Sequence, residues 1–241
     1  MQDVDKISAL RRKIIELSLL VNESARLEHA VYTYEPSLDR ECWVHFVPTR
    51  FVYSVFTFNM LYSINWKESI NKGRIIEFDS GLRNREDGVP ESKKMSEYFN
   101  FCFSNDEFME VNKVWFKDTV LKNMTPNQIV EELNKIRPDV DRYGYVNRNG
   151  NIRADSFIKK FQESVYEVII DSDFSEENIY NVYNFIYKIR CNIFHGVKTI
   201  TEMMDPDQQK RLEIYSRFLY AANSMVFRYL NYLQYGPKED D

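Results

Sequence analysis

The chain of 241 residues is short of several residue types, and each shortage excludes a class of protein. Its three cysteines, Cys42, Cys102 and Cys191, are too few and too scattered for a disulfide framework or a zinc site, and they indicate a reduced, cytoplasmic protein. Seven glycines and seven prolines, against 16 tyrosines and 17 phenylalanines, are typical of a compact, aromatic-rich globule. No run is apolar over the roughly 20 residues that span a bilayer, so we expect no membrane association.

The charge balance is acidic. A formal net charge of −5 argues against broad electrostatic capture of nucleic acid, because such binding requires clustered lysine and arginine. A local basic patch is compatible with this charge. The first residues, Met1 to Lys6, include acids where a signal peptide has bases, so we expect the mature chain to begin here.

Apolar residues recur at helical spacing along most of the chain, which predicts a mainly all-α protein. Capping signals of the Ser/Thr-x-x-Glu/Gln type mark helix starts at Ser104 with Glu107 and at Thr125 with Gln128, and Gly73 marks a helix end. The last helix is expected to open at Asp205 and to end at Gly236. Helices are predicted at about 3–31, 48–73, 105–122, 126–136, 156–171, 176–195 and 206–234.

The predicted domain organisation is a single helical domain over 1–241, which suits a chain of this length. We expect a bundle core at about 1–73 and 156–236, in which the first two helices are antiparallel neighbours. The segment at about 74–155 is interpreted as an irregular insertion. It could contain a short strand at 74–78 or a hairpin around the Asn149-Gly150 turn.

The residues with the clearest chemical potential lie at 190–196, Arg-Cys-Asn-Ile-Phe-His-Gly. This is the only place where a guanidinium, an amide and an imidazole cluster in the sequence. The other two histidines, His29 and His45, are interpreted as structural residues. No metal site is predicted.

The segment 187–198, Tyr-Lys-Ile-Arg-Cys-Asn-Ile-Phe-His-Gly-Val-Lys, resembles the signature of the HEPN superfamily, in which Arg is followed after four to six residues by His. The Phe58-Asn59 pair in an aromatic-rich helix, and a long helix that begins at an Asp, are similar to the flanking features of that family. The resemblance implies an up-and-down helical bundle and a homodimer formed through the helix that carries the motif. The segment 74–155 matches no family.

The resemblance to HEPN ribonucleases implies metal-independent RNA cleavage without a cofactor, in which a ribose 2′-hydroxyl attacks its own phosphate. His195 would transfer the proton, because the unperturbed imidazole pKa of about 6.5 lies near cellular pH. Arg190 would neutralise the charge that builds on phosphorus. Asn192 would hold the imidazole tautomer or contact the ribose, and Lys198 would be a further phosphate contact. Such enzymes act in toxin–antitoxin or antiviral defence systems, restrained by an inhibitory or nucleotidylating protein partner.

Helix geometry leaves a structural interpretation open. Arg190 and His195 lie about 140° apart around an ideal helix, and Asn192 and His195 about 60° apart. Arg190 could therefore be a buried cation paired with an acid such as Asp171 or Glu167, and His195 a helix-end residue favoured by the dipole. A homodimer would relieve the difficulty by bringing two imidazoles and two guanidiniums into one cleft.

The helix at 176–195 also has a second aromatic stripe, which could serve a partner or the core. Its members are Tyr180, Tyr183, Tyr187 and Phe194. Two further functions stay open: a non-catalytic HEPN-like module that binds a nucleotide, RNA or a protein, and an unrelated helical protein with a chance motif. Because Arg190, Asn192 and His195 are all present, the sequence favours the enzyme.

Overall fold

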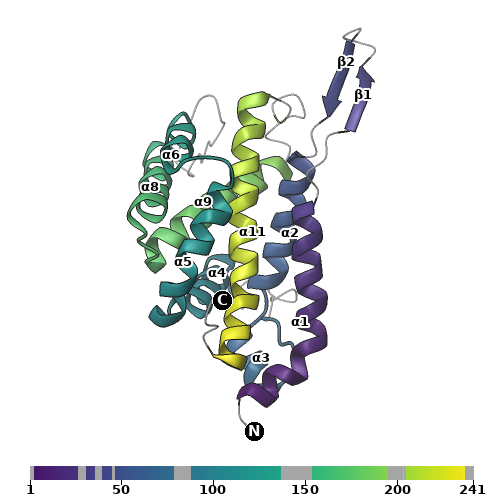
Figure 1. Cartoon of the computed structure of the whole chain (residues 1–241), viewed down its shortest axis with the longest axis vertical. Helices are drawn as coiled ribbons and strands as arrows, with labels where there is room; N and C mark the ends of the chain where they lie inside the picture. Colours follow the sequence, from purple (N-terminus) through teal and green to yellow (C-terminus); the bar gives the residue numbers. More distant parts are fainter. Residues whose placement is uncertain are drawn as a thin grey trace.

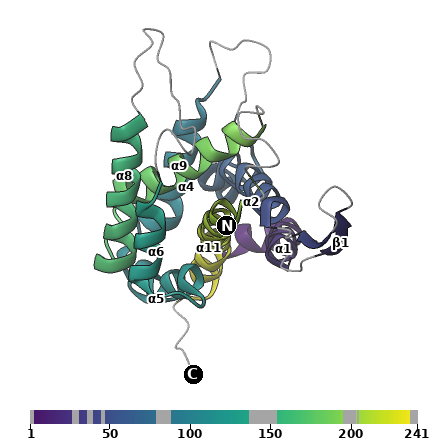
Figure 2. The same ribbon diagram turned by 90° about the horizontal axis from the view of Figure 1, so that it is seen from above.

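The computed structural model describes residues 3–26, 31–35, 40–44, 47–78, 88–136, 154–194, 203 and 205–236. Most of these residues are helical, which confirms the predicted all-α fold. The long helix α11 (Pro206–Tyr235) stands at the centre, with α1 (Asp3–Arg26) and α2 (Val47–Tyr62) on one side (Figures 1 and 2). Both of these helices pack against α11, and they run antiparallel to each other, as predicted.

The first helix is shorter than predicted, because α1 ends at Arg26 and Val31 begins a strand. Strands β1 (Val31–Glu35) and β2 (Arg40–Val44) pair antiparallel, with Val31 opposite Val44 and Glu35 opposite Arg40. Figure 1 shows this hairpin projecting beyond the helices. The β-branched and aromatic residue types of 31–34 and 43–44 favour strands, a signal that the extended apolar periodicity obscured.

The predicted helix at 48–73 is two helices, α2 and α3 (Trp66–Lys72). Asn65 separates them, and its side chain caps α3 by accepting a hydrogen bond from the Glu68 amide at 3.1 Å. Gly73 ends α3 with a left-handed φ of 62°, at the predicted residue. The strand suggested at 74–78 is a single antiparallel bridge between Ile64 and Glu77.

Within the described part of the segment predicted as an insertion, three helices follow: α4 (Glu91–Phe103), α5 (Asp106–Leu121) and α6 (Pro126–Asn134). The last two agree with the prediction, whereas α4 was missed. Thr125 and Gln128 form the predicted capping box of α6. The cap of α5 is Asn105 rather than Ser104, since its side chain accepts from the Phe108 amide at 2.8 Å. The hairpin suggested at 143–152 lies outside the described residues.

The C-terminal third consists of α8 (Ala154–Tyr166), a π-helical turn η2 (Glu167–Asp171), α9 (Glu176–Phe194) and α11. Helix α9 lies mainly against α8 and α4, and it also touches α2 and α11. The Asp205 carboxylate caps α11 by accepting from the amides of Asp207 and Gln208, as its sequence position predicts.

An aromatic cluster at the centre joins the elements. The Phe58 ring of α2 lies 5.8 Å from that of Tyr98, 6.0 Å from Phe99 and 5.5 Å from Tyr183. The Tyr98 hydroxyl donates to the Ala222 carbonyl of α11 at 2.7 Å, which satisfies a buried phenol. Residues of the predicted insertion therefore share one core with residues of the predicted bundle. The division into bundle and insertion stays a prediction.

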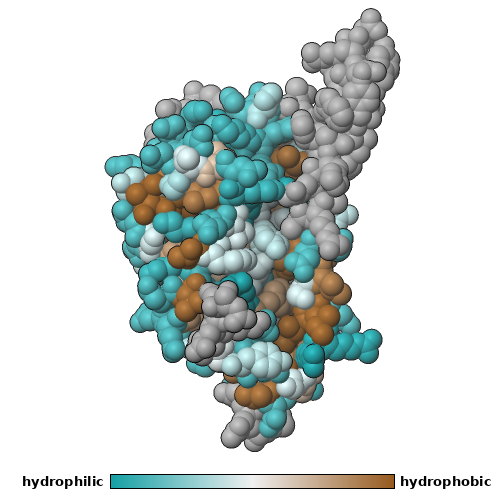
Figure 3. Space-filling view, in the orientation of Figure 1, coloured by the Kyte–Doolittle hydropathy of each residue, from teal (hydrophilic) through white to brown (hydrophobic). Residues whose placement is uncertain are grey.

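Apolar side chains also reach the surface. On the face seen in Figure 3 they gather over α1, where Ile15 and Leu19 are exposed, and on the opposite flank over α6 and α8. None of the helices described is long and apolar enough to cross a membrane.

Candidate functional site

The structure describes two of the four residues predicted to form a site. Arg190 and Asn192 lie on the last turns of α9, whose final described residue is Phe194. His195 and Lys198 lie outside the described residues. The catalytic grouping of Arg190 with His195 therefore stays a prediction, and the environment of Arg190 is what the geometry adds.

The Arg190 guanidinium sits among aromatic rings. Its Cζ lies 4.8 Å from the ring centre of Phe194 and 5.6 Å from that of Tyr187, distances at which a cation is attracted to the π face. Its nearest polar contact is weak, with Nη1 3.8 Å from the Cys191 sulfur. The Nε atom is buried and has no hydrogen-bond partner.

Within the part of the chain that the structure describes, Arg190 forms no ion pair. The suggested partners Asp171 and Glu167 belong to η2, which precedes the start of α9, and neither forms an ion pair with Arg190. The interpretation of Arg190 as one half of a buried ion pair with either residue is therefore wrong. A guanidinium stays charged at any cellular pH, so Arg190 is a cation without an ion pair among the described residues, and its Nε still has a donor to offer.

Helix α2 forms the facing wall of this site. The Phe56 ring packs edge-on against Phe194, with centroids 5.4 Å apart. Tyr62, two turns further along α2, is close enough for Arg190 to influence its ionisation. Asn59 lies between these two positions at helical spacing, and its Oδ1 is buried without a hydrogen-bond partner. The α9 side of the site thus has an unpaired donor, and α2 has an unpaired acceptor on the helix that faces it.

Two tyrosines next to Arg190 are held neutral. Burial raises the pKa of Tyr187 to about 12, helped by Cys191 and Glu91 and opposed by Arg190. Burial, with a hydrogen bond to Glu91, raises the pKa of Tyr62 well above its ordinary value of 10.0. Both phenols are therefore hydrogen-bonding groups, not charges, at neutral pH.

An exposed apolar stripe adjoins the site. It consists of Tyr53, Phe56 and Met60 of α2 together with Phe194, each between 43% and 50% exposed. The aromatic stripe predicted on α9 is not one exposed surface: Tyr183 is fully buried, and Phe194 is the member of the stripe that is exposed. The α2 half was missed, although the 53, 56, 60 spacing places these residues on one helix face.

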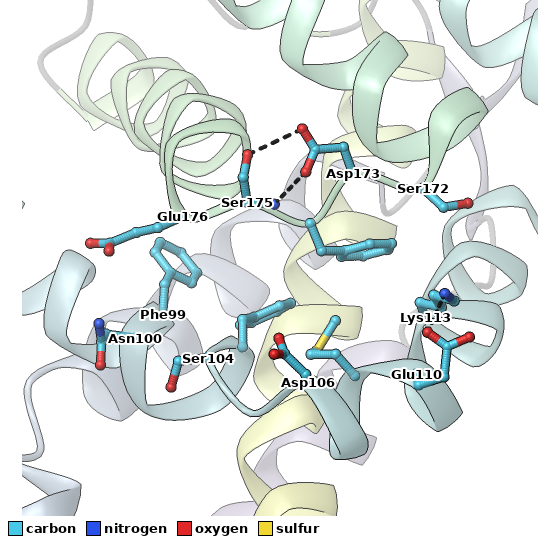
Figure 4. Close-up of a pocket in the computed structure, with 13 residues that line it drawn as sticks. Phe99, Asn100, Ser104, Asp106, Glu110, Lys113, Ser172, Asp173, Ser175 and Glu176 are labelled. Carbon is cyan, nitrogen blue, oxygen red and sulfur yellow. Dashed lines mark hydrogen bonds and ion pairs between the residues drawn. The ribbon is translucent and has the colours of Figure 1, made fainter.

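Two cavities lie near the opposite end of α9. The smaller, of about 480 Å³, is lined by Asp106, Glu110, Asp173 and Glu176 with Lys113 as its lysine (Figure 4). Its carboxylates surround the opening, and that of Asp173 accepts hydrogen bonds from Ser175 (Figure 4). This acidic lining repels an anion such as phosphate, whereas the Arg190 end of α9 carries a cation that attracts one.

Among the residues whose positions are described, no group of three or more His, Cys, Asp or Glu side chains could hold a metal ion. Comparison with protein-family models, with curated proteins and with solved structures gives no match. The resemblance to the HEPN superfamily therefore rests on the sequence pattern alone.

Proposed function

We propose that this protein is a metal-independent endoribonuclease of the HEPN type. The observation that supports it best is the state of Arg190, a permanent cation without an ion pair in the described structure and with a buried, unpaired Nε. A purely structural arginine at such a position would normally be paired, because an uncompensated charge near the interior is costly. A phosphate would supply both the negative charge and the acceptors that Arg190 lacks.

In the proposed reaction the ribose 2′-hydroxyl attacks the adjacent phosphorus and expels the 5′-oxygen of the next nucleotide, leaving a 2′,3′-cyclic phosphate. His195, which directly follows Phe194, removes or returns the proton. Arg190 stabilises the charge that develops on the phosphoryl oxygens. Asn192 orients the imidazole or the ribose, and Lys198 holds a further phosphate.

The proposal includes a two-fold homodimer formed along the exposed stripe of Tyr53, Phe56, Met60 and Phe194. Burying this stripe against its copy would remove apolar surface from water and bring two Arg190 residues into proximity. Two copies of His195 would then provide both the base and the acid that a single turnover needs. Phe194 and Phe56 are the residues that join the stripe to the site, because their rings touch.

The test is incubation of the purified protein with total RNA in EDTA. We expect discrete cleavage that chelation does not reduce, and fragments that end in 2′,3′-cyclic phosphate. An oligonucleotide with 2′-deoxyribose at the cleaved position should survive, because its internal nucleophile is missing. Cleavage that EDTA abolishes, or that proceeds at the deoxy position, contradicts the proposal.

A second candidate is a non-catalytic module that binds a nucleotide, RNA or a protein partner. It is favoured by the exposed aromatic residues beside a cation, which could stack a base and hold a phosphate without chemistry. Unchanged RNA that nevertheless co-migrates with the protein on a native gel would select this alternative.

As an RNA-cleaving enzyme, the protein would need restraint in its own cell. We propose that it acts in the cytoplasm as the effector of a toxin–antitoxin or antiviral defence system, held in check by an inhibitory or nucleotidylating protein. Expression of the chain alone should then arrest growth, and the Arg190→Ala variant should not.

A further inference from the structure

A second candidate site is a cavity of about 800 Å³ between α3, α4 and the C-terminal end of α11. This volume is in the range of small-molecule sites. Aromatic rings form one wall: Trp66 and Phe101 stack with centroids 6.4 Å apart, and Tyr229 meets Phe101 edge-on at 5.1 Å. The Trp66 indole N–H is already bound to the Leu61 carbonyl at 2.9 Å, so this wall is held in place by the fold.

The rim of this cavity is acidic. Three carboxylates line it, those of Glu68, Glu97 and Glu176, against the single lysine Lys67. Glu68 forms an ion pair with Lys72, and Glu97 forms one with the exposed Lys93 at 3.8 Å. Glu176 accepts a hydrogen bond from a serine hydroxyl and forms no ion pair within the described residues.

The smaller cavity adjoins this one and strengthens its negative potential. Asn100, Ser104 and Glu176 line both. The smaller cavity adds Asp106, Glu110 and Asp173, whose carboxylates border its opening in Figure 4. A ligand in the larger cavity would therefore experience carboxylates from both sides of Glu176, with the Asn100 amide beside it.

We infer that the larger cavity binds a small organic cation, a protonated amine that carries an aromatic or aliphatic body. The apolar body would lie against Phe101 and Tyr229, where burial of its apolar surface favours it. The ammonium group would lie between Glu97 and Glu176. A nucleotide would fit the rings but would be rejected by the carboxylates, since its phosphates are anionic.

This site is separate from Arg190. Glu176 opens α9 and Arg190 lies near its other end, about 21 Å away at a rise of about 1.5 Å per residue. Ligand binding here can thus be measured without RNA, and its failure would leave the proposed nuclease untouched.

The experiment compares three probes that share an indole ring and differ in charge: tryptamine, indole and indole-3-acetate. Calorimetric titration of the full chain at pH 7 is expected to show tryptamine binding at least about tenfold more tightly than indole, and no binding of indole-3-acetate. Amide shifts in a ¹H–¹⁵N spectrum should concentrate on α3 and α4. Equal binding of all three probes, or no binding of tryptamine at millimolar concentration, overturns the inference.

Variants locate the charge recognition. In the Glu97→Gln, Glu176→Gln double variant the preference for tryptamine over indole should disappear, while indole binding is retained because the aromatic wall is intact. The matched control is Glu163→Gln on α8, an exposed acid paired with Lys159, which should bind tryptamine as the unaltered protein does. The same loss in the control would attribute the preference to overall charge and refute the site.

Discussion

The guanidinium carbon of Arg190 lies 4.8 Å from the ring centre of Phe194, on the last described turn of α9. This pair places a permanent cation directly beside an exposed aromatic residue. The Phe194 ring in turn touches Phe56 of α2. The candidate chemical site and the candidate dimer surface are thus contiguous, and a substitution in one is expected to affect the other.

The first prediction concerns the proposed catalytic pair. Arg190→Ala and His195→Ala should each reduce RNA cleavage by a factor of about 10² or more, because both groups act on the transition state. Arg190→Lys should recover only part of the activity, since an ammonium cannot present the planar donor fork. Cleavage rates on a labelled RNA measure this, together with melting temperatures.

The control is Arg12→Ala, which removes a highly exposed arginine of α1 and should leave cleavage unchanged. If Arg190→Ala unfolds the protein and His195→Ala retains full activity, the two residues are structural.

The second prediction concerns assembly. Phe56→Glu should weaken a homodimer by about tenfold or more, because it would place an unpaired carboxylate in the proposed interface, and it should lower cleavage in parallel. Light scattering over a micromolar concentration series checks the molecular mass. Val114→Glu is the matched control, because Val114 is similarly exposed on α5 and lies outside the stripe. A monomeric protein that still cleaves RNA contradicts the dimer.

The third prediction compares two phenylalanines on the same helix. Phe58 is 1% exposed at the centre of the aromatic cluster, whereas Phe56 is 44% exposed. Phe58→Ala should lower the free energy of unfolding by about 3–5 kcal/mol through the cavity it leaves. Phe56→Ala should cost less than about 1 kcal/mol in dilute, monomeric protein. Urea denaturation followed by circular dichroism measures both, and equal losses would place Phe56 in the core.

The fourth prediction concerns alkaline pH. Folding raises the pKa of Tyr187 to about 12 from its ordinary value of 10.0, so the folded chain holds this proton more tightly than the unfolded chain does. Its contribution to stability is therefore complete below about pH 10 and is lost as the pH rises toward 12. Burial shifts the pKa of Tyr98 and Tyr183 in the same direction.

The measurement is the free energy of unfolding from pH 8 to pH 11.5. The contribution of the tyrosines to this free energy should stay constant at first and then fall as the pH rises. The fall should be shallower in Tyr187→Phe, which has no proton to lose. Identical pH dependence in the two proteins would show that Tyr187 titrates alike in the folded and unfolded chains.

The fifth prediction concerns the start of α11. Asp205→Ala should destabilise the protein by about 1 kcal/mol, because two amides lose their acceptor. Asp205→Asn keeps a side-chain acceptor and should cost only a fraction of that. A thermal melt of both variants distinguishes loss of the cap from a general effect of charge.

Much of the fold could be predicted because the signals are local. The capping box of Thr125 and Gln128, the cap at Asp205 and the glycine stop at Gly73 each act within about four residues, so they can be identified in the sequence alone. Helical periodicity likewise located α5, α6, α9 and α11. The motif at 190–196 was identified in the same way, by residue type and spacing.

Tertiary contacts decided the rest. Helix α4 was missed although its buried residues Met95, Tyr98, Phe99, Cys102 and Phe103 have helical spacing. What only the fold shows is its distant partner, the Ala222 carbonyl that accepts from Tyr98. The break at Asn65 and the hairpin at 31–44 were missed because apolar periodicity alone does not show where a local preference for a cap or a strand outweighs the helix. The position of α11 at the centre, and the absence of an ion pair to Arg190 among the described residues, follow from which helices pack together. Such long-range contacts leave no short spacing in the sequence, so only the folded chain reveals them.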